Sequence, residues 1–240
     1  MARPRSLRAV TEAAPPAPST RWRDADFCVV DLETTGLDPE AHEIISFAAL
    51  HIAGGRLRLD DARYQVVRPR RMPDPATIRI HGLRSGDLLD APALEGALDD
   101  LLEALAGKVM VAHVASIEQA FLDITLRRVG TRLVNPIVDT AALASQLFRR
   151  RGRRRAPVRL TPLAHALDLP VHRPHEADGD ALTTAQVFLA LATHLDRFSP
   201  QTVGSLVQLS RPVSGRSLLR RALRRVRERM RSAGTEGTCP

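Results

Sequence analysis

The first strongly apolar segment of the chain is Phe27-Cys28-Val29-Val30-Asp31-Leu32-Glu33, which ends in two acids separated by one residue. An apolar run of this length is typical of a strand buried on both faces. Side chains i and i+2 of a strand point to the same face, with Cα atoms ~6.6 Å apart, so Asp31 and Glu33 would project together. Paired carboxylates bind hard divalent cations, although this pattern alone more often marks two solvated acids.

The segments after this run predict hairpin strands first and alternating strands and helices later. Ile44–Ile52 has the pattern of a second strand, and Gly54-Gly55 provides the turn into a third that ends near Val67. The later elements are expected as a helix over 92–106, strands over 109–112 and 137–139, helices from 116 and after 139 and 160, and a longer helix over 178–196. Ser116 is expected to cap the helix that follows it. We therefore expect an α/β fold, a mixed sheet with antiparallel strands 1–3 and parallel later strands, flanked by helices.

The ends of the chain differ from its centre in composition. Residues 1–25 are rich in Pro and Arg and are predicted to form a flexible leader, and 199–240 form a basic extension with an Arg-rich helical pattern over 216–231. The domain is expected between them, over 26–198. The net charge is +8, and an arginine cluster over 149–159 follows Phe148, which indicates either a patch that guides a nucleic-acid strand or a solvated loop.

Several classes of protein are excluded by the composition. No apolar run reaches the ~18 residues of a membrane span, and the N-terminus lacks the apolar region of a secretory signal. Cys28 and Cys239 are the only cysteines and cannot build a disulfide framework or a Cys-rich zinc site. We expect a cytoplasmic protein with no membrane partner.

Two further motifs combine a histidine with an acid five residues later. His113 follows the predicted strand over 109–112 and precedes Glu118, and His175 precedes Asp180 at the start of the long helix. A loop histidine and an acid in the first turn of the next helix can face one site together. Each motif is ordinary alone, because an acid is also favoured at the positive end of a helix.

Taken together and in this order, the motifs between Phe27 and Asp196 resemble the DEDDh exonuclease family, the DNA polymerase III epsilon-subunit-like branch of the ribonuclease H-like nucleases. The matching segments lie at 30–37 (VDLETTGL), 80–83 (IHGL), 111–122, 138–140 and 175–181. The resemblance implies a ribonuclease H-like fold. It also implies 3′→5′ removal of nucleotides from DNA or RNA with two divalent cations, Mg²⁺ or Mn²⁺.

The resemblance also implies a role for each site residue. Asp31 would bridge both metal ions, Glu33 and Asp180 would complete the first metal site, and Glu118 would support the second. His175 would act as the general base, a role that suits the ordinary imidazole pKa of ~6.5.

The remaining matches imply contacts to the substrate or to the core. Thr34, Thr35 and His81 would border the terminal nucleotide. His113 closes a buried strand and is expected to be structural.

The second motif departs from the family pattern at three positions. Val114, Ile117 and Glu118 stand where the family usually has Asn, Phe and Asp. The longer Glu keeps the charge but moves the carboxylate by about 1 Å, a misplacement that can cost ~10²-fold in rate. A catalytically weakened nucleic-acid-binding module therefore stays open as an alternative. An exonuclease that trims RNA or short oligonucleotides is a second alternative, because the motifs of the family serve both sugars.

The expected partner is the single-stranded 3′ end of a nucleic acid. With aromatic residues at 3%, phosphate contacts should outweigh base stacking. A DNA polymerase or a sliding clamp has weaker support. Gln208-Leu209-Ser210 resembles the start of a clamp-binding peptide, but Arg211-Pro212 replaces its apolar end.

Overall fold

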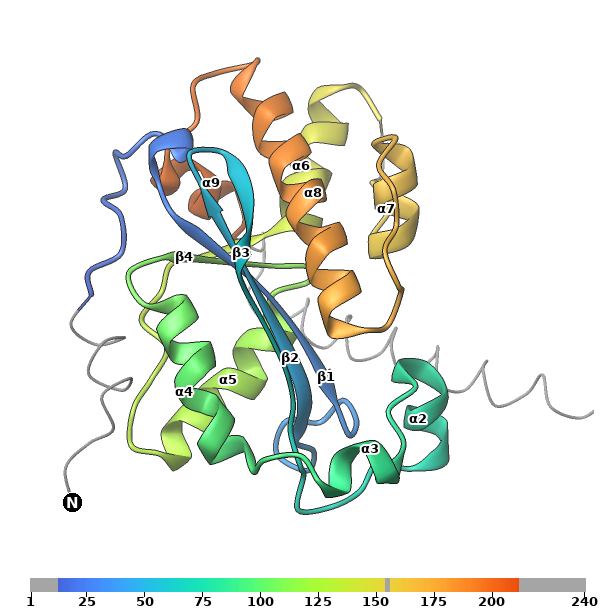
Figure 1. Ribbon diagram of the computed structural model, residues 1–240. Coiled ribbons are helices and arrows are strands. Elements are labelled where there is room, and N and C mark those ends of the chain that lie inside the picture. Colours follow the sequence, from blue (N-terminus) through green and yellow to red (C-terminus); the bar gives the residue numbers. More distant parts are fainter. Residues whose placement is uncertain (1–12, 154–155, 212–240) are drawn as a thin grey trace, which may run out of the picture.

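A five-stranded mixed sheet forms the centre of the computed structural model, which describes residues 13–153 and 156–211 (Figure 1). Its strands are β1 (Phe27–Thr34), β2 (Ile44–Ala53), β3 (Arg56–Val66), β4 (Val109–Ala112) and β5 (Ile137–Asp139), in the order β3-β2-β1-β4-β5. The first three strands pair antiparallel, whereas β4 runs parallel to β1 and β5 parallel to β4. The predicted fold class is confirmed.

Helices cover both faces of the sheet (Figure 1). The helices on one face are α4 (Leu94–Leu105) and α5 (Ser116–Arg128), and those on the other are α6 (Thr140–Arg150), α7 (Leu160–Ala166), α8 (Ala177–Asp196) and α9 (Val203–Leu209). Cys28 and Val30 of β1 pack in the first layer, and Phe27 and Val29 pack in the second. Because side chains alternate along a strand, Asp31 continues the row of Phe27 and Val29 on the α8 face.

Both ends of the described chain pack against this domain and extend it beyond the expected 26–198. Trp22, in the short 3-10 helix η1 (Trp22–Asp24), is only 1% exposed, and its ring meets the edge of Phe188 with centroids 6.2 Å apart. In α9, Val203 and Leu206 are buried in the same layer. Arg21 and Thr202 form a β-bridge, which places the two ends side by side. The expected leader residues 1–12 and the Arg-rich helical pattern over 216–231 lie outside the described residues.

Two short helices between β3 and α4 were not predicted from the sequence. In α2 (Pro75–His81), the Asp74 carboxylate accepts the backbone N–H of Thr77 at 2.8 Å, and Pro75 occupies the first turn. The second short helix, α3 (Ser85–Leu89), follows directly. The Asp-Pro signal of a helix start was therefore present in the sequence.

Three local interpretations need correction or completion. Ser116 does not cap α5: Ala115 is the N-cap, and the Ser116 hydroxyl points back to the Val114 carbonyl at 3.5 Å. Phe148 is 3% exposed and belongs to the core, so its ring cannot guide a strand. Leu209 packs against the same core and Ser210 is buried, unlike residues of an extended clamp-binding peptide. No helix in the described part of the chain is long and apolar enough to span a bilayer.

We expect Phe188→Ala to destabilise the protein by about 3–5 kcal/mol, because the cavity would remove the ring that contacts both Trp22 and Phe27. Urea denaturation monitored by circular dichroism measures the change. Phe198→Ala is the matched control, since the Phe198 side chain is 52% exposed. It should cost less than about 1 kcal/mol. Equal losses in the two variants would contradict the packing described.

Candidate active site

Three carboxylates converge at the carboxyl end of β1. Asp31 and Glu33 come from the strand and Asp180 from the first turn of α8, and one oxygen from each lies within 4.8 Å of the others. In the neighbouring strand, Ala48 lies opposite Asp31 and Ser46 opposite Glu33. These side chains are small, so the start of α8 can approach the acids.

A glycine allows the loop before α8 to lie against the helix. A Cβ on Gly179 would lie 2.4 Å from the Arg173 carbonyl oxygen and 2.6 Å from that of His172, closer than any side chain tolerates. The loop itself carries His175, whose backbone N–H donates to the Asp180 carboxylate at 3.0 Å. His175 has a φ of 67°, and this backbone hydrogen bond fixes its Cα relative to the acid cluster.

Glu118 approaches the cluster from the first turn of α5. Its side chain is buried, and within the described chain its Oε2 atom has no hydrogen-bond partner. Its charge acts on both β1 acids, raising the pKa of Asp31 and of Glu33. Glu118 nevertheless stands outside the group of three whose oxygens lie within 4.8 Å.

Burial and mutual repulsion make these acids hard to ionise. Burial first, then the Glu33 and Glu118 charges, raises the pKa of Asp31 well above its ordinary value. Burial raises the pKa of Glu118 to about 8, and the Asp139 charge adds to this. Within the described residues, no Arg or Lys forms an ion pair with Asp31, Glu33 or Glu118. Oxygen ligands that lack a cationic partner fit a hard divalent cation such as Mg²⁺ or Mn²⁺.

Asp139 positions the turn that leads to Glu118. One of its carboxylate oxygens accepts the backbone N–H of Val114 at 3.1 Å and those of Ala141 and Ala142 at 2.8 and 3.4 Å. It therefore joins the start of α6 to the turn before α5. Val114 has a φ of 61°, a left-handed conformation that is unfavourable for a β-branched residue. The sequence marked the segment 138–140 as a family match but gave Asp139 no role.

The sequence model of the family described as Exonuclease matches residues 28–188, most of the described domain. The chain belongs to the DEDDh exonuclease family. The epsilon subunit of DNA polymerase III from Salmonella typhimurium is 30% identical over 68% of this chain and 70% of its own. The PolC-type DNA polymerase III of Thermotoga maritima is 35% identical over 69% of this chain. This chain covers only 12% of the length of that polymerase.

Solved exonuclease structures share the fold. Exonuclease X, in complex with 5′-overhanging duplex DNA, covers 77% of this chain and 99% of its own with a TM-score of 0.59 at 22% identity. The nuclease domain of 3′hExo, a DEDDh family member bound to rAMP, covers 77% and 97% with a TM-score of 0.62 at 18% identity. Exonuclease I of E. coli, in complex with a dT13 oligonucleotide, covers 72% and 42% with a TM-score of 0.65 at 15% identity.

The side chains of His113, Thr34, Thr35 and His81, which the resemblance singled out, form hydrogen bonds within the protein. His113 Nε2 lies 2.8 Å from the Val158 carbonyl oxygen, so it carries the proton there, and Nδ1 lies 2.9 Å from the Thr140 hydroxyl. Burial lowers the pKa of His113 to about 4. A neutral His113 thus ties β4 to the loop before α7, in keeping with its expected structural role.

The side chains expected to border the terminal nucleotide have intramolecular contacts. The Thr35 hydroxyl accepts the backbone N–H of Glu43 at 3.0 Å and so holds the loop between β1 and β2, and the Thr34 hydroxyl donates to the Gly36 carbonyl at 2.6 Å. His81 is buried, and its Nδ1 accepts the backbone N–H of Leu83 at 3.0 Å. No described hydrogen bond joins these three side chains to the acid cluster, so their contact with a nucleotide stays a prediction.

Tyr64 lies on the same sheet face as the acid cluster and was not predicted. It pairs with Ala48 across β2 and β3, just as Ala48 pairs with Asp31 across β1 and β2. The three side chains therefore share one face of the sheet. Burial is the main cause of the raised pKa of Tyr64. The charges of Asp178 and Glu176 raise it further, and the Glu33 charge has a smaller effect in the same direction. The alternation of side chains along β3 would have identified Tyr64 only once the register of β3 against β2 was known.

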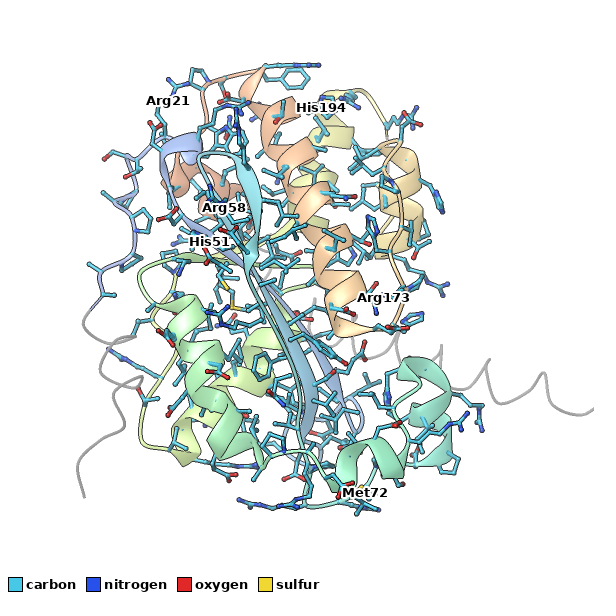
Figure 2. The ribbon with its side chains drawn as sticks, viewed as in Figure 1. Arg21, His51, Arg58, Met72, Arg173 and His194 are labelled. Carbon is cyan, nitrogen blue, oxygen red and sulfur yellow. The ribbon has the colours of Figure 1, made fainter. Side chains whose placement is uncertain are left out.

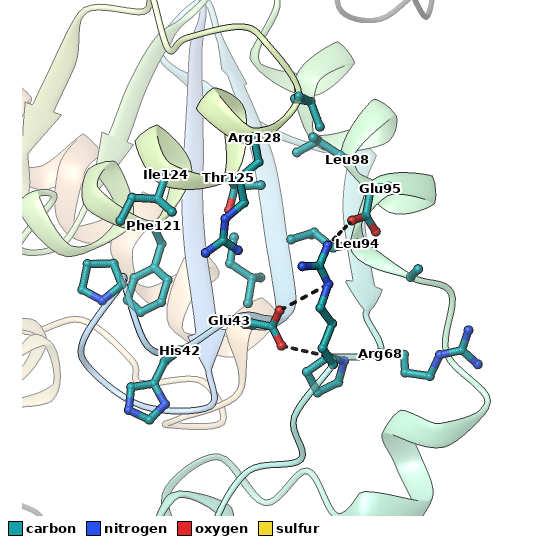
Figure 3. Close-up of a pocket in the computed structure, with 16 residues that line it drawn as sticks. His42, Glu43, Arg68, Leu94, Glu95, Leu98, Phe121, Ile124, Thr125 and Arg128 are labelled. Atoms are coloured by element: carbon teal, nitrogen blue, oxygen red, sulfur yellow. Dashed lines mark hydrogen bonds and ion pairs between the residues drawn. The ribbon is translucent and has the colours of Figure 1, made fainter.

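A cavity in the described chain lies apart from this site. It has a volume of about 270 Å³ and lies between the start of β2, α4 and α5 (Figure 3). The Arg70 guanidinium lies 3.2 Å from Glu95, and the Arg70 backbone N–H donates to Glu43 at 2.8 Å. None of the four predicted acids lines this cavity.

We expect Glu118→Gln to stabilise the metal-free protein at neutral and higher pH. In the unfolded chain Glu118 ionises near its ordinary pKa of 4.5, whereas in the folded protein its pKa is about 8. Between these values the unfolded state binds fewer protons, so the stability of the parent falls as the pH rises. Gln cannot ionise and escapes this loss.

Thermal unfolding in EDTA tests this expectation. The two proteins should melt together near pH 4.5 and diverge toward pH 8. The variant should gain roughly 2–4 °C for each kcal/mol recovered. Glu103→Gln, at an exposed position of α4, is the control and should show no pH-dependent gain. A parallel pH dependence of Glu118→Gln and its parent would refute the burial effect.

We expect Val114→Asn to stabilise the protein by about 1 kcal/mol, because Asn adopts a positive φ at lower cost than a β-branched residue. Guanidinium denaturation measures the gain. Val158→Asn makes the same exchange at an exposed position and should be neutral within about 0.5 kcal/mol. A loss of stability in Val114→Asn would mean that Val114 contributes packing that outweighs its strain.

Proposed function

We propose that this protein is a 3′→5′ exonuclease that hydrolyses the terminal phosphodiester bond of a DNA or RNA strand and releases nucleoside monophosphates. The observation that carries the proposal is the convergence of Asp31, Glu33 and Asp180 within 4.8 Å, with Glu118 buried nearby. Phosphodiester hydrolysis needs positive charge beside a polyanionic substrate, and four acids gathered at one site are suited to hold it.

The proposed roles follow the positions of the acids. The charges of the other three acids all act on Asp31, which would contact both cations. Glu33 and Asp180 would bind the first cation, and Glu118 the second. Bound there, two Mg²⁺ or Mn²⁺ ions would supply charge neutralisation for the phosphate and activation of the attacking water. His175 would accept the proton of that water, and its backbone hydrogen bond to Asp180 supports this placement.

The relatives support the substrate class without deciding the sugar. Exonuclease X is described in complex with DNA, and the nuclease domain of 3′hExo is described bound to rAMP. We therefore include RNA trimming as the first alternative. Similarity to a DNA polymerase III epsilon subunit also supports association with a polymerase as a proposal.

A catalytically weakened nucleic-acid-binding module is the second candidate. Glu118 favours it, because the raised pKa of this acid disfavours the ionised form that binds metal. The three converging acids of β1 and α8 favour the exonuclease instead, because a binding module has no need of them.

We expect wild-type protein to shorten 5′-labelled single-stranded DNA or RNA from the 3′ end in Mg²⁺ or Mn²⁺ but not in EDTA. Asp31→Asn keeps the shape but removes a bridging charge, and should lower the rate by about 10³-fold or more. Asp100→Asn, on an exposed turn of α4, is the matched control and should keep full activity.

Metal binding gives a second readout that is independent of turnover. Mn²⁺ should raise the melting temperature of the wild type and of Asp100→Asn more than that of Asp31→Asn. Folded wild type that binds labelled strands and Mn²⁺ without shortening either nucleic acid would support the binding module. Activity that persists in Asp31→Asn would reject the assigned site.

A further inference from the structure

Exposed arginines gather where α6 and α8 end together. The distal arginine patch is defined here by these residues: Arg149, Arg150, Arg151, His194, Arg197 and Phe198. The Arg150 guanidinium carbon lies 5.8 Å from the centroid of the Phe198 ring, which brings the two helix ends into contact. The Phe198 side chain is 52% exposed, an unusual position for one of the few aromatic residues of the chain.

Arginines of the patch act together on His194. Burial lowers the pKa of His194, and the nearby charges of Arg151 and Arg197 lower it further. Arg151 comes from the end of α6 and Arg197 directly follows α8, so the positive charge arises from tertiary packing as well as from the arginine run in the sequence.

These arginines are not neutralised by acids within the described part of the chain. None of Arg149, Arg150, Arg151 and Arg197 has a carboxylate partner there. Asp196, the acid next to Arg197, instead accepts the Gln201 backbone N–H at 2.7 Å and lies 4.0 Å from Arg23. A concentration of exposed, uncompensated guanidinium groups favours a polyanion as partner.

The patch lies far from the acid cluster but is connected to it. Figure 2 shows Arg173 near the start of α8 and His194 near its end. The helical rise of 1.5 Å per residue puts about 24 Å between Asp180 and Asp196 along the helix axis. Helix α6 also starts at the active-site edge, directly after Asp139, and ends at Arg150 in the patch. The two helices thus span the distance from the site to the patch.

We propose that the distal arginine patch is a second nucleic-acid contact, which binds the substrate strand upstream of the 3′ end held at the acid cluster. This inference rests on the proposed function. At ~3.4 Å per stacked nucleotide, the strand reaches the patch only when it is about seven nucleotides or longer. Arginines would contact its phosphates, and the exposed Phe198 ring offers a surface on which a base stacks.

The deciding variant is Arg150→Ala/Arg151→Ala/Arg197→Ala. Binding of a labelled strand of roughly twenty nucleotides is measured by fluorescence anisotropy in EDTA, so that hydrolysis plays no part. Loss of three phosphate contacts should weaken binding about 10-fold or more, and should reduce the slope of log K against log salt by about 2. Phe198→Leu should weaken binding several-fold and leave the salt slope unchanged, because only stacking is lost.

Matched controls separate the patch from general charge effects. Arg127→Ala/Arg128→Ala/Arg132→Ala removes the same charge from exposed positions at the end of α5 and should bind like the parent. The corresponding triple Lys variant of the patch keeps the charge and should keep the salt slope. In Mg²⁺, kcat/KM of the Ala variant should fall for the long strand and stay unchanged for a tetranucleotide.

Three outcomes would overturn the proposal: unchanged binding of the long strand, an equal loss on the tetranucleotide, or an equal loss in the α5 control. Patch-dependent binding to anionic lipid vesicles without binding to the strand would also overturn it and would assign the patch to a lipid surface. Because anisotropy requires no turnover, patch-dependent binding by a protein that hydrolyses nothing would refute the proposed function and leave the patch in place.

Discussion

Repulsion among closely spaced carboxylates is the constraint on which the rest of this structure depends. Asp31, Glu33 and Asp180 meet within 4.8 Å, and Glu118 lies buried beside them, so ionising all of them without a cation is costly. A chain that folded only for stability would separate these groups or pair them with arginine. Within the described residues, no arginine or lysine forms an ion pair with Asp31, Glu33 or Glu118. The small side chains of Ala48 and Ser46 lie opposite the two β1 acids. The packing of the two apolar layers offsets this cost, and the three converging carboxylates form a group that could hold a metal ion.

Three separate structural features bring the acids together. The alternation of β1 places two of them on one face, and the α8 acid arrives with a loop that passes within 2.4 Å of the position a Gly179 Cβ would take. The α5 acid arrives through the Val114 turn, held by the Asp139 carboxylate. Val114 and His175 both have positive φ, at a cost of order 1–3 kcal/mol each. In both turns a carboxylate accepts the backbone N–H of the strained residue, so side chains near the site stabilise the backbone that forms it.

Local patterns in the sequence predicted the sheet and the main helices, and the resemblance to the exonuclease family singled out the acids that converge at the site. The apolar pattern correctly predicted the bounds of β4 and the start of β2 at Ile44. Strands that are buried on both faces form continuous apolar runs, so their positions are easy to recognise in the sequence. Features that depend on distant partners were missed. The burial of Trp22 requires Phe188, and the intramolecular role of the Thr35 hydroxyl requires Glu43. Ser116 looked like a cap because its side chain suits that position, but the Val114 turn starts the helix one residue earlier.

The β-bridge between Arg21 and Thr202 has a consequence for larger assemblies. Backbone hydrogen bonds of 3.2 Å from Trp22 to Gln201 and 2.9 Å from Val203 to Thr20 reinforce the bridge. When the first and last segments of a domain lie side by side, the domain adds little distance between the parts of a polypeptide that flank it. Such a unit can be gained or lost in evolution without separating its neighbours. PolC-type polymerases, in which the matching region is 12% of the chain, accommodate a domain of this kind within a much longer polypeptide.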